Sequence, residues 1–350
     1  MRVLIPVLAM ALSVSSLSAA AATFNNLYQV RQPVQSQQAE VRDAGLKQAL
    51  DVQVLRLTGL PAALKTTAVK SLRDDPQVVI RQYGYEPDGQ ALLVDFDANA
   101  LERKLREADL ALWGANRPAV LTWWLSDAQS GSQLLGDGQS SAQLIKAAAQ
   151  YRGVVARLPM ADLSEQVGVT GEVIDAADQA SLQALAERYS ADVMMAVHAR
   201  EGAEQWQADW YLWREQALEK GQVSATDQAA LADAVMLAVT QTLAPHYVVA
   251  PGQSALMKVQ IDGADLTRFA AVERVMEGFA GRLLSAKGGR LLYEVNASAE
   301  QLRGQLGLLQ LQEGAPTLKA ETETETETET GAPVVSEVVQ PSDDRLYFHW

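Results

Sequence analysis

The two ends of the chain carry the same order of hydrophobic patterns: a strand, a helix, two strands joined by a turn, and a second helix. A period of about 3.6 residues indicates a helix, and strict alternation indicates a strand. The patterns fall at residues 26–34, 46–57, 78–85, 91–96 and 101–112, and again at residues 256–261, 266–279, 282–286, 290–295 and 302–309. This order is typical of a small sheet covered by helices.

Between these ends, apolar strands and striped helices alternate. Strands are predicted at residues 119–125, 154–158, 193–199, 205–213 and 222–225, and helices at residues 144–151, 182–189 and 231–238. Such interleaving favours a mainly parallel or mixed sheet. We therefore predict an α+β fold, in which a βαββα unit at each end flanks a central α/β module with a mixed sheet. The two end units share this pattern but show no identity residue by residue.

The first residues have the three regions of a secretory signal. Arg2 supplies the positive start, residues 3–12 an apolar run, and residues 19–22 a stretch of alanines suited to cleavage. The apolar run is about half of the roughly 20 residues that a membrane-spanning helix needs. The chain has no cysteine, so it has no site for a lipoprotein anchor and no disulfides. We predict cleavage after Ala22 and a periplasmic protein with no transmembrane or lipid anchor.

The sequence divides into six predicted segments. Residues 321–330 are five Glu-Thr pairs, which cannot bury apolar area and indicate a solvated spacer. The segments are a signal peptide (1–22), an N-terminal α+β domain (23–114), a central α/β domain (115–250), a C-terminal α+β domain (251–312), a disordered acidic Glu-Thr linker (313–344) and a terminal strand (345–350).

Charge and motifs limit the possible functions. The formal charge is -14, with 43 acidic and 29 basic residues, which opposes binding to nucleic acid. The mature sequence contains no H-E-x-x-H, G-x-S-x-G or S-x-x-K pattern. His198 lies on an apolar strand and is interpreted as a satisfied sheet residue, and Asp97 as a helix N-cap. We predict no catalytic, cofactor-binding or metal-binding residues, although a carboxylate pair would leave no linear signature.

Aromatic residues provide one candidate surface. Trp206 and Trp210 share one face of the strand at residues 205–213, whereas Tyr211 and Trp213 share the other. The first face is interpreted as core. The second is explained either by a sheet covered on both sides or by an exposed surface for a glycan or a partner protein.

The terminal segment, residues 345–350, provides a second candidate surface. Leu346, Phe348 and Trp350 alternate with polar or mixed residues at a strand period. So apolar a segment is expected to pair with a sheet. The sheet is either the chain's own or the edge of a partner's sheet.

Four segments, residues 27–30, 54–59, 117–125 and 186–193, resemble the proteobacterial domain of unknown function 2066 family. The resemblance covers residues 27–309. It implies an exported gammaproteobacterial protein and assigns no catalytic or binding residue.

The sequence therefore favours a non-catalytic periplasmic protein that acts as a docking or assembly module in the cell envelope, with envelope proteins as partners. The alternative is a protein that binds or cleaves a glycan such as peptidoglycan.

Overall fold

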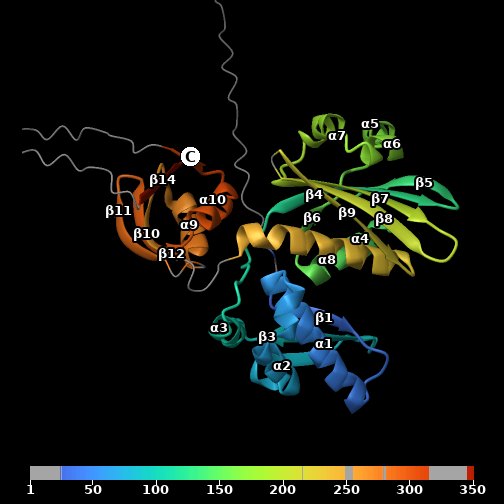
Figure 1. Ribbon diagram of the computed structural model, residues 1–350, viewed down its shortest axis with the longest axis horizontal. Helices are drawn as coiled ribbons and strands as arrows, with labels where there is room; N and C mark the ends of the chain where they lie inside the picture. Colours follow the sequence, from blue (N-terminus) through green and yellow to red (C-terminus); the bar gives the residue numbers. More distant parts are fainter. Residues whose placement is uncertain are drawn as a thin grey trace, which may run out of the picture.

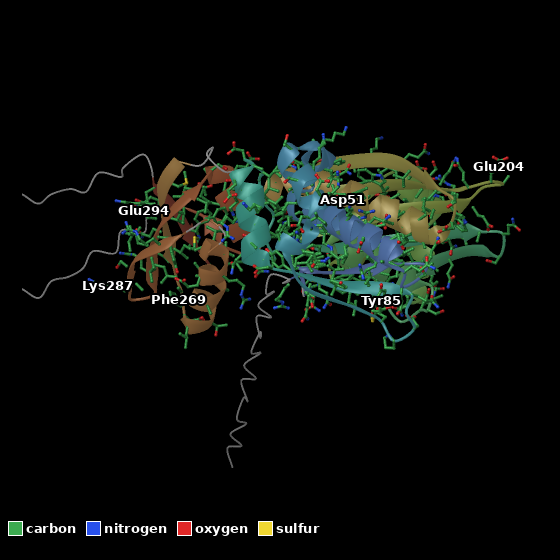
Figure 2. The ribbon with its side chains drawn as sticks, turned by 90° about the horizontal axis from the view of Figure 1, so that it is seen from below. Asp51, Tyr85, Glu204, Phe269, Lys287 and Glu294 are labelled. Carbon is green, nitrogen blue, oxygen red and sulfur yellow. The ribbon has the colours of Figure 1, made fainter. Side chains whose placement is uncertain are left out.

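The chain folds into three parts, each with its own sheet and hydrophobic cluster (Figure 1). The computed structural model describes residue 24 and residues 26–214, 216–248, 255–277, 279, 281–314 and 345–350. The predicted signal peptide and the Glu-Thr tract lie outside these residues. The combination of helices with mixed sheets confirms the predicted α+β class. Figure 2 shows Glu204 of the central part and Lys287 of the C-terminal part at opposite ends of the molecule.

The N-terminal part is a three-stranded antiparallel sheet in the order β1-β3-β2, packed against helices. Its elements are β1 (Gln29–Pro33), α1 (Ala39–Thr58), η1 (Pro61–Lys65), α2 (Thr67–Asp74), η2 (Pro76–Val78), β2 (Ile80–Tyr85), β3 (Ala91–Phe96) and α3 (Ala98–Glu107). As predicted, the Asp97 side chain caps α3 by accepting a hydrogen bond from the Ala100 N–H. The pattern at residues 101–112 predicted a longer helix, but α3 ends shortly before Asp109, whose φ is 56°.

Helix α1 ends at Gly59, close to the end of the predicted pattern at residues 46–57, and the structure shows why glycine is needed there. Gly59 has a φ of 64°, a left-handed conformation that favours glycine. A Cβ at this position would lie 2.0 Å from the Ala244 Cβ on the central part. Helix α1 begins earlier than the predicted pattern at residues 46–57, and its N-cap residue, Gln38, makes no side-chain cap hydrogen bond.

The central part is a six-stranded mixed sheet in the order β5-β4-β7-β8-β9, with β6 paired to β4. Strands β4, β6 and β7 are parallel, and the other pairs are antiparallel. The elements are β4 (Ala119–Ala128), β5 (Gly131–Leu135), α4 (Ala142–Arg152), β6 (Val155–Arg157), α5 (Leu163–Gly168), α6 (Gly171–Asp175), α7 (Gln179–Ala186), β7 (Val193–Glu201), β8 (Trp206–Arg214), β9 (Ala217–Ala225) and α8 (Gln228–Tyr247).

Helices cover both faces of this sheet. Helices α4 and α8 lie on one face and α5, α6 and α7 on the other (Figure 1). Successive strand residues point to opposite faces, so Trp124 packs under α4 and α8 whereas Trp123 packs under the other layer. Two covered faces explain why β4 and β7 are nearly continuous apolar runs.

The C-terminal part repeats the connectivity of the N-terminal part. In both, the third strand lies between the first and the second, and the second strand has an irregular register beside the third. The C-terminal sheet has two further strands and the full order β11-β12-β10-β14-β13. Its elements are β10 (Ala255–Asp262), α9 (Leu266–Glu277), β11 (Arg282–Lys287), β12 (Arg290–Ala297), α10 (Ala299–Gly307), β13 (Gln312–Glu313) and β14 (Arg345–His349).

Two buried arginines join the N-terminal and central parts. Arg56 and Arg117 are 1% and 0% exposed, and among the described residues no carboxylate pairs with either. Arg56 donates to the backbone oxygens of Leu27 (3.2 Å), Gln29 (2.7 Å), Gln150 (2.9 Å) and Tyr151 (2.8 Å). Arg117 donates to those of Arg56 (2.6 Å), Trp113 (3.0 Å), Gly114 (3.0 Å) and Gly153 (2.8 Å).

Their position explains how two cations can be buried together. Gln150, Tyr151 and Gly153 belong to the C-terminal end of α4, where helix carbonyls lack partners and carry partial negative charge. Burial lowers the pKa of Arg117 to about 9 and that of Arg56 to about 10. Both guanidinium groups therefore stay protonated at neutral pH. Arg56 ties the end of α4 to β1, and Arg117 ties it to the end of α1.

Helix α10 joins the C-terminal part to the central part. The Asn116 amide donates to the Gln305 side-chain oxygen at 2.7 Å, and the Gln305 amide donates to the Tyr247 backbone oxygen at 3.1 Å. The Gln301 amide donates to the Val248 backbone oxygen at 2.6 Å. Across the described part of the chain, no helix combines the length and apolar character that crossing a bilayer requires.

Candidate functional site

The aromatic face predicted on β8 lies beneath helices. Trp213 is 3% exposed and packs in the cluster under α7. Tyr211 stacks beside it, with ring centroids 6.1 Å apart, and its hydroxyl donates to the Asp175 backbone oxygen at 3.4 Å. At this place the sheet is covered on both sides, as one of the two sequence-based alternatives expected.

The terminal segment forms β14 within the chain's own sheet. It pairs parallel with β10 and antiparallel with β13. Phe348 is 3% exposed, and Leu346 and Trp350 pack partly buried against the same cluster. The Trp350 indole N–H donates to the Leu309 backbone oxygen at 3.0 Å. In this structure all three apolar side chains face the chain's own core.

His198 lies at the centre of a charged cluster on the sheet face that α6 covers. Its Nε2 is 2.7 Å from an Asp127 carboxylate oxygen, and its Nδ1 is 2.9 Å from an Asp175 carboxylate oxygen. Arg200 contacts Asp175 at 2.8 Å and Asp209 at 2.5 Å, and its Nη2 lies 3.0 Å from the His198 Nδ1. Both ring nitrogens have polar partners. His198 is thus a satisfied sheet residue.

This cluster makes stability depend on pH through its carboxylates. Burial acts to raise the pKa of Asp127, but hydrogen bonds from Ser132 and His198 outweigh it and the pKa is lowered. Burial likewise opposes the shift at Asp175, where His198 and Arg200 lower the pKa. A carboxylate with a lower pKa in the folded state stabilises the fold above its unfolded pKa of about 3.8, and this stabilisation is lost as the pH falls through the folded value.

We expect acidification below about pH 4 to lower the melting temperature less in the double variant Asp127→Asn, Asp175→Asn than in the unmodified protein. Thermal unfolding between pH 3 and pH 7 measures the difference. Glu204→Gln, at the β7–β8 turn, is the control and should leave the pH dependence unchanged. Parallel curves for the double variant and the unmodified protein would contradict this role for the two carboxylates.

A second polar network holds the short helix α5 in place. Glu165 is 0% exposed and forms a capping box with Asp162. Arg188 contacts Glu165 at 2.5 Å and Asp162 at 2.7 Å, and the Tyr189 hydroxyl donates to Glu165 at 2.5 Å. A helix of six residues has little stability of its own. Its position is therefore fixed by these side chains.

Helix α5 and the segment before it present three large apolar side chains to solvent. Met160, Leu163 and Val167 are 65%, 76% and 71% exposed. Leu163 and Val167 lie one helical turn apart on the same side of α5. We call these three residues the α5 patch. Exposed apolar residues that cluster within a charged rim are typical of protein interaction sites.

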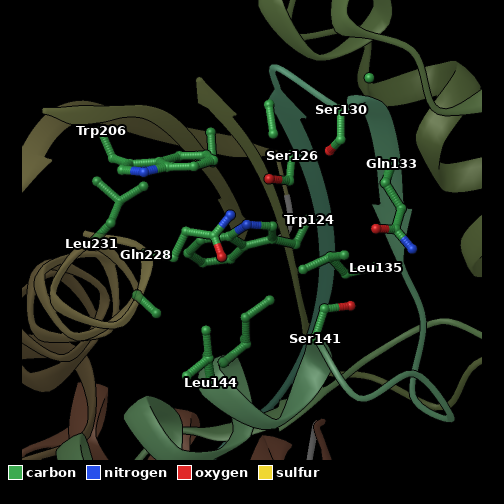
Figure 3. Close-up of a pocket in the computed structure, with 15 residues that line it drawn as sticks. Trp124, Ser126, Ser130, Gln133, Leu135, Ser141, Leu144, Trp206, Gln228 and Leu231 are labelled. Atoms are coloured by element: carbon green, nitrogen blue, oxygen red, sulfur yellow. The ribbon is translucent and has the colours of Figure 1, made fainter. Parts of the chain in front are cut away.

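A cavity of about 190 Å³ opens between the sheet and the N-terminal ends of α4 and α8 (Figure 3). Trp124 and Trp206 form two of its walls, and Leu144 and Leu231 contribute apolar floor. The polar lining consists of Ser126, Ser130, Gln133, Ser141 and Gln228. The described residues around this cavity include no acidic or basic side chain. Its lining therefore offers apolar surface and uncharged hydrogen-bonding groups.

Sequence reasoning missed both the cavity and the α5 patch. The cavity combines residues of β4, β5, β8, α4 and α8, which only the fold brings together. One signal was present, because Ser126 shares the inward face of Trp124 on an otherwise apolar strand. The α5 patch lies in residues that the sequence indicated as loop.

Comparisons with known proteins identify an uncharacterised domain and limited structural similarity. Residues 21–114 match a family described as Domain of unknown function (DUF8605). This match covers the N-terminal part and is to a different family from the one that the sequence segments resemble. A comparison with curated proteins found no match.

Three solved structures resemble parts of the chain. The Protein Y N-terminal domain of Thermus thermophilus is 14% identical, with 22% of this chain and 83% of that chain covered and a TM-score of 0.15. A competence-damaged protein (CinA) superfamily protein of Escherichia coli is 16% identical, with coverages of 42% and 86% and a TM-score of 0.22. A lipoprotein of Neisseria meningitidis is 12% identical, with coverages of 36% and 98% and a TM-score of 0.21.

Proposed function

We propose that this chain is an exported, non-catalytic protein that docks partner proteins in the bacterial cell envelope. The α5 patch is the observation that carries the proposal. Three exposed apolar side chains are costly to keep in water unless a partner covers them. The Glu165 network holds them in a fixed arrangement, so little conformational entropy is lost on binding.

The charge around the patch indicates the kind of partner. Asp162 and Arg188 lie beside it and are each more than a third exposed. The patch thus has an apolar centre beside one acidic and one basic side chain. This arrangement favours binding to another protein whose surface has an apolar core and a polar rim. The saturated nitrogens of His198 and the uncharged cavity support binding rather than catalysis.

Location and family are part of the same proposal. The charged, apolar and small-residue regions of residues 1–22 support export to the periplasm. The resemblance to the domain of unknown function 2066 family supports membership of that family. Two of its segments, residues 117–125 and 186–193, form β4 and the connection into β7, beyond the DUF8605 match.

We expect Leu163→Asp to abolish crosslinking to the partner in cells while leaving the fold intact. Leu163 is 76% exposed and occupies the first turn of α5, where an acidic residue is favourable. The melting temperature should therefore stay nearly constant, as for most exposed substitutions. Crosslinking in intact cells, followed by purification through a tag, isolates the crosslinked proteins. Mass spectrometry then identifies them and compares their amounts between the variant and the unmodified chain.

The matched control is Leu266→Asp. Leu266 is 85% exposed and also begins a helix, but it lies on the C-terminal part. The control should retain the crosslinked protein. Equal recovery of the same proteins from both variants and the unmodified chain would reject the α5 patch as the docking site.

A further inference from the structure

We propose that the cavity between Trp124 and Trp206 binds a single neutral sugar ring. This site is separate from the α5 patch, since it lies under the opposite face of the central sheet. The inference does not depend on the docking function. It gives the ligand-binding alternative a defined location.

Two polar groups that open into the cavity are free to bind a ligand. Ser126 is 9% exposed and Trp124 is 4% exposed. Among the described residues, neither the Ser126 hydroxyl nor the Trp124 indole N–H has a hydrogen-bond partner. A ligand with hydroxyl groups can hydrogen-bond to both of them in place of water. In Figure 3 the Ser126 hydroxyl points toward the space between the two indole rings.

The lining of the cavity disfavours charged ligands. An ion taken into the cavity would lose its hydration without gaining an opposite charge, because the described lining residues are all uncharged. The protein's formal charge of -14 disfavours anions further. The ligand is therefore a neutral molecule that offers an oxygen to the Trp124 N–H and a hydroxyl or carbonyl to Ser126.

The distribution of apolar and polar groups favours a sugar. A pyranose ring has apolar C–H faces and a rim of hydroxyl groups. Trp124 and Trp206 offer apolar surface to the faces, and Ser130, Gln133 and Gln228 offer hydrogen-bonding groups at the mouth. A volume of about 190 Å³ is smaller than a typical pocket for a drug-sized ligand. It suits one ring, and a longer glycan would extend out through the mouth.

Saturation-transfer NMR with four monosaccharides and one trisaccharide tests the ligand class. We expect glucose or N-acetylglucosamine to bind saturably, and glucose 6-phosphate and glucosamine to bind at least tenfold more weakly because each carries a charge. The β-1,4-linked trimer of N-acetylglucosamine should bind about as tightly as the monomer if one ring enters, and more tightly if neighbouring rings also contact the protein. Both results support a sugar site. Failure of both neutral sugars, or equal binding of all four monosaccharides, would overturn the proposal.

Variants locate the binding in the cavity. Ser126→Ala removes one hydrogen bond at little cost in volume and should weaken neutral-sugar binding about tenfold. Trp206→Ala removes a wall and should weaken it by at least as much. Tyr83→Ala is the control, because Tyr83 is an aromatic residue 39% exposed on the N-terminal part. Unchanged affinity in both cavity variants, with melting temperatures preserved, would place any sugar binding elsewhere. Leu163→Asp should leave sugar binding unchanged.

Discussion

Replacing Arg117 with alanine is expected to destabilise the protein by about 3–5 kcal/mol, because it removes several buried hydrogen bonds and leaves a cavity. The guanidinium is 0% exposed and donates to four backbone oxygens. Alanine would leave these oxygens without a donor in a buried cavity. It would also remove the cation from the Trp113 ring, whose centroid lies 4.2 Å from the guanidinium carbon.

Urea denaturation followed by tryptophan fluorescence measures this loss. Arg117→Lys is expected to have a stability between those of the unmodified protein and Arg117→Ala. It keeps the positive charge, but a single ammonium group cannot reach the same set of backbone oxygens. It should recover only part of the stability. Arg103→Ala changes an exposed arginine on α3 and is the control, expected to stay within about 0.5 kcal/mol. A loss below about 1 kcal/mol for Arg117→Ala would show that the carbonyls find water or other donors.

Deleting residues 345–350 is expected to destabilise the C-terminal part by at least about 3 kcal/mol. The deletion removes the burial of Phe348, which contributes roughly 1.5–3 kcal/mol for a fully buried large side chain. It also removes the ladder hydrogen bonds that β14 shares with β10 and β13. Hydrogen exchange at the β10 amides and the melting temperature of the isolated protein measure the effect.

His349→Ala is the control for this deletion, since His349 is exposed within the same strand. It should leave both measurements nearly unchanged. If the deletion left stability intact but removed a copurifying protein, the segment would instead pair with the sheet of a partner. That result would contradict the placement of β14 in the chain's own sheet.

Local patterns predict the two end units because local interactions form them. The alternation at residues 91–96 and the turn before it define one hairpin, and Gly59 and Asp97 define helix ends. Helices α5 and α6, predicted as loop, have six and five residues, too few to show a helical period. Their side-chain caps, Asp162 and Thr170, were the only local signals.

Tertiary contacts decide the features that the sequence did not predict. Arginine is expected on a solvated face, and Arg56 and Arg117 are buried because the C-terminal end of α4 supplies acceptors from another part of the chain. The strand period of residues 345–350 was visible, but not its partner, because β10 lies far away in sequence. His198 was interpreted correctly as satisfied, although its partners Asp127 and Asp175 come from separate elements.

The order of the C-terminal sheet has a consequence for synthesis. Strand β10 cannot pair on both sides until residues 345–349 have been made, long after β12 has been translated. Until β14 docks, the chain carries an unpaired edge of β10 that other chains or chaperones can capture. A chain truncated before residue 345 would keep that edge open, so shortened translation products should be the aggregating species.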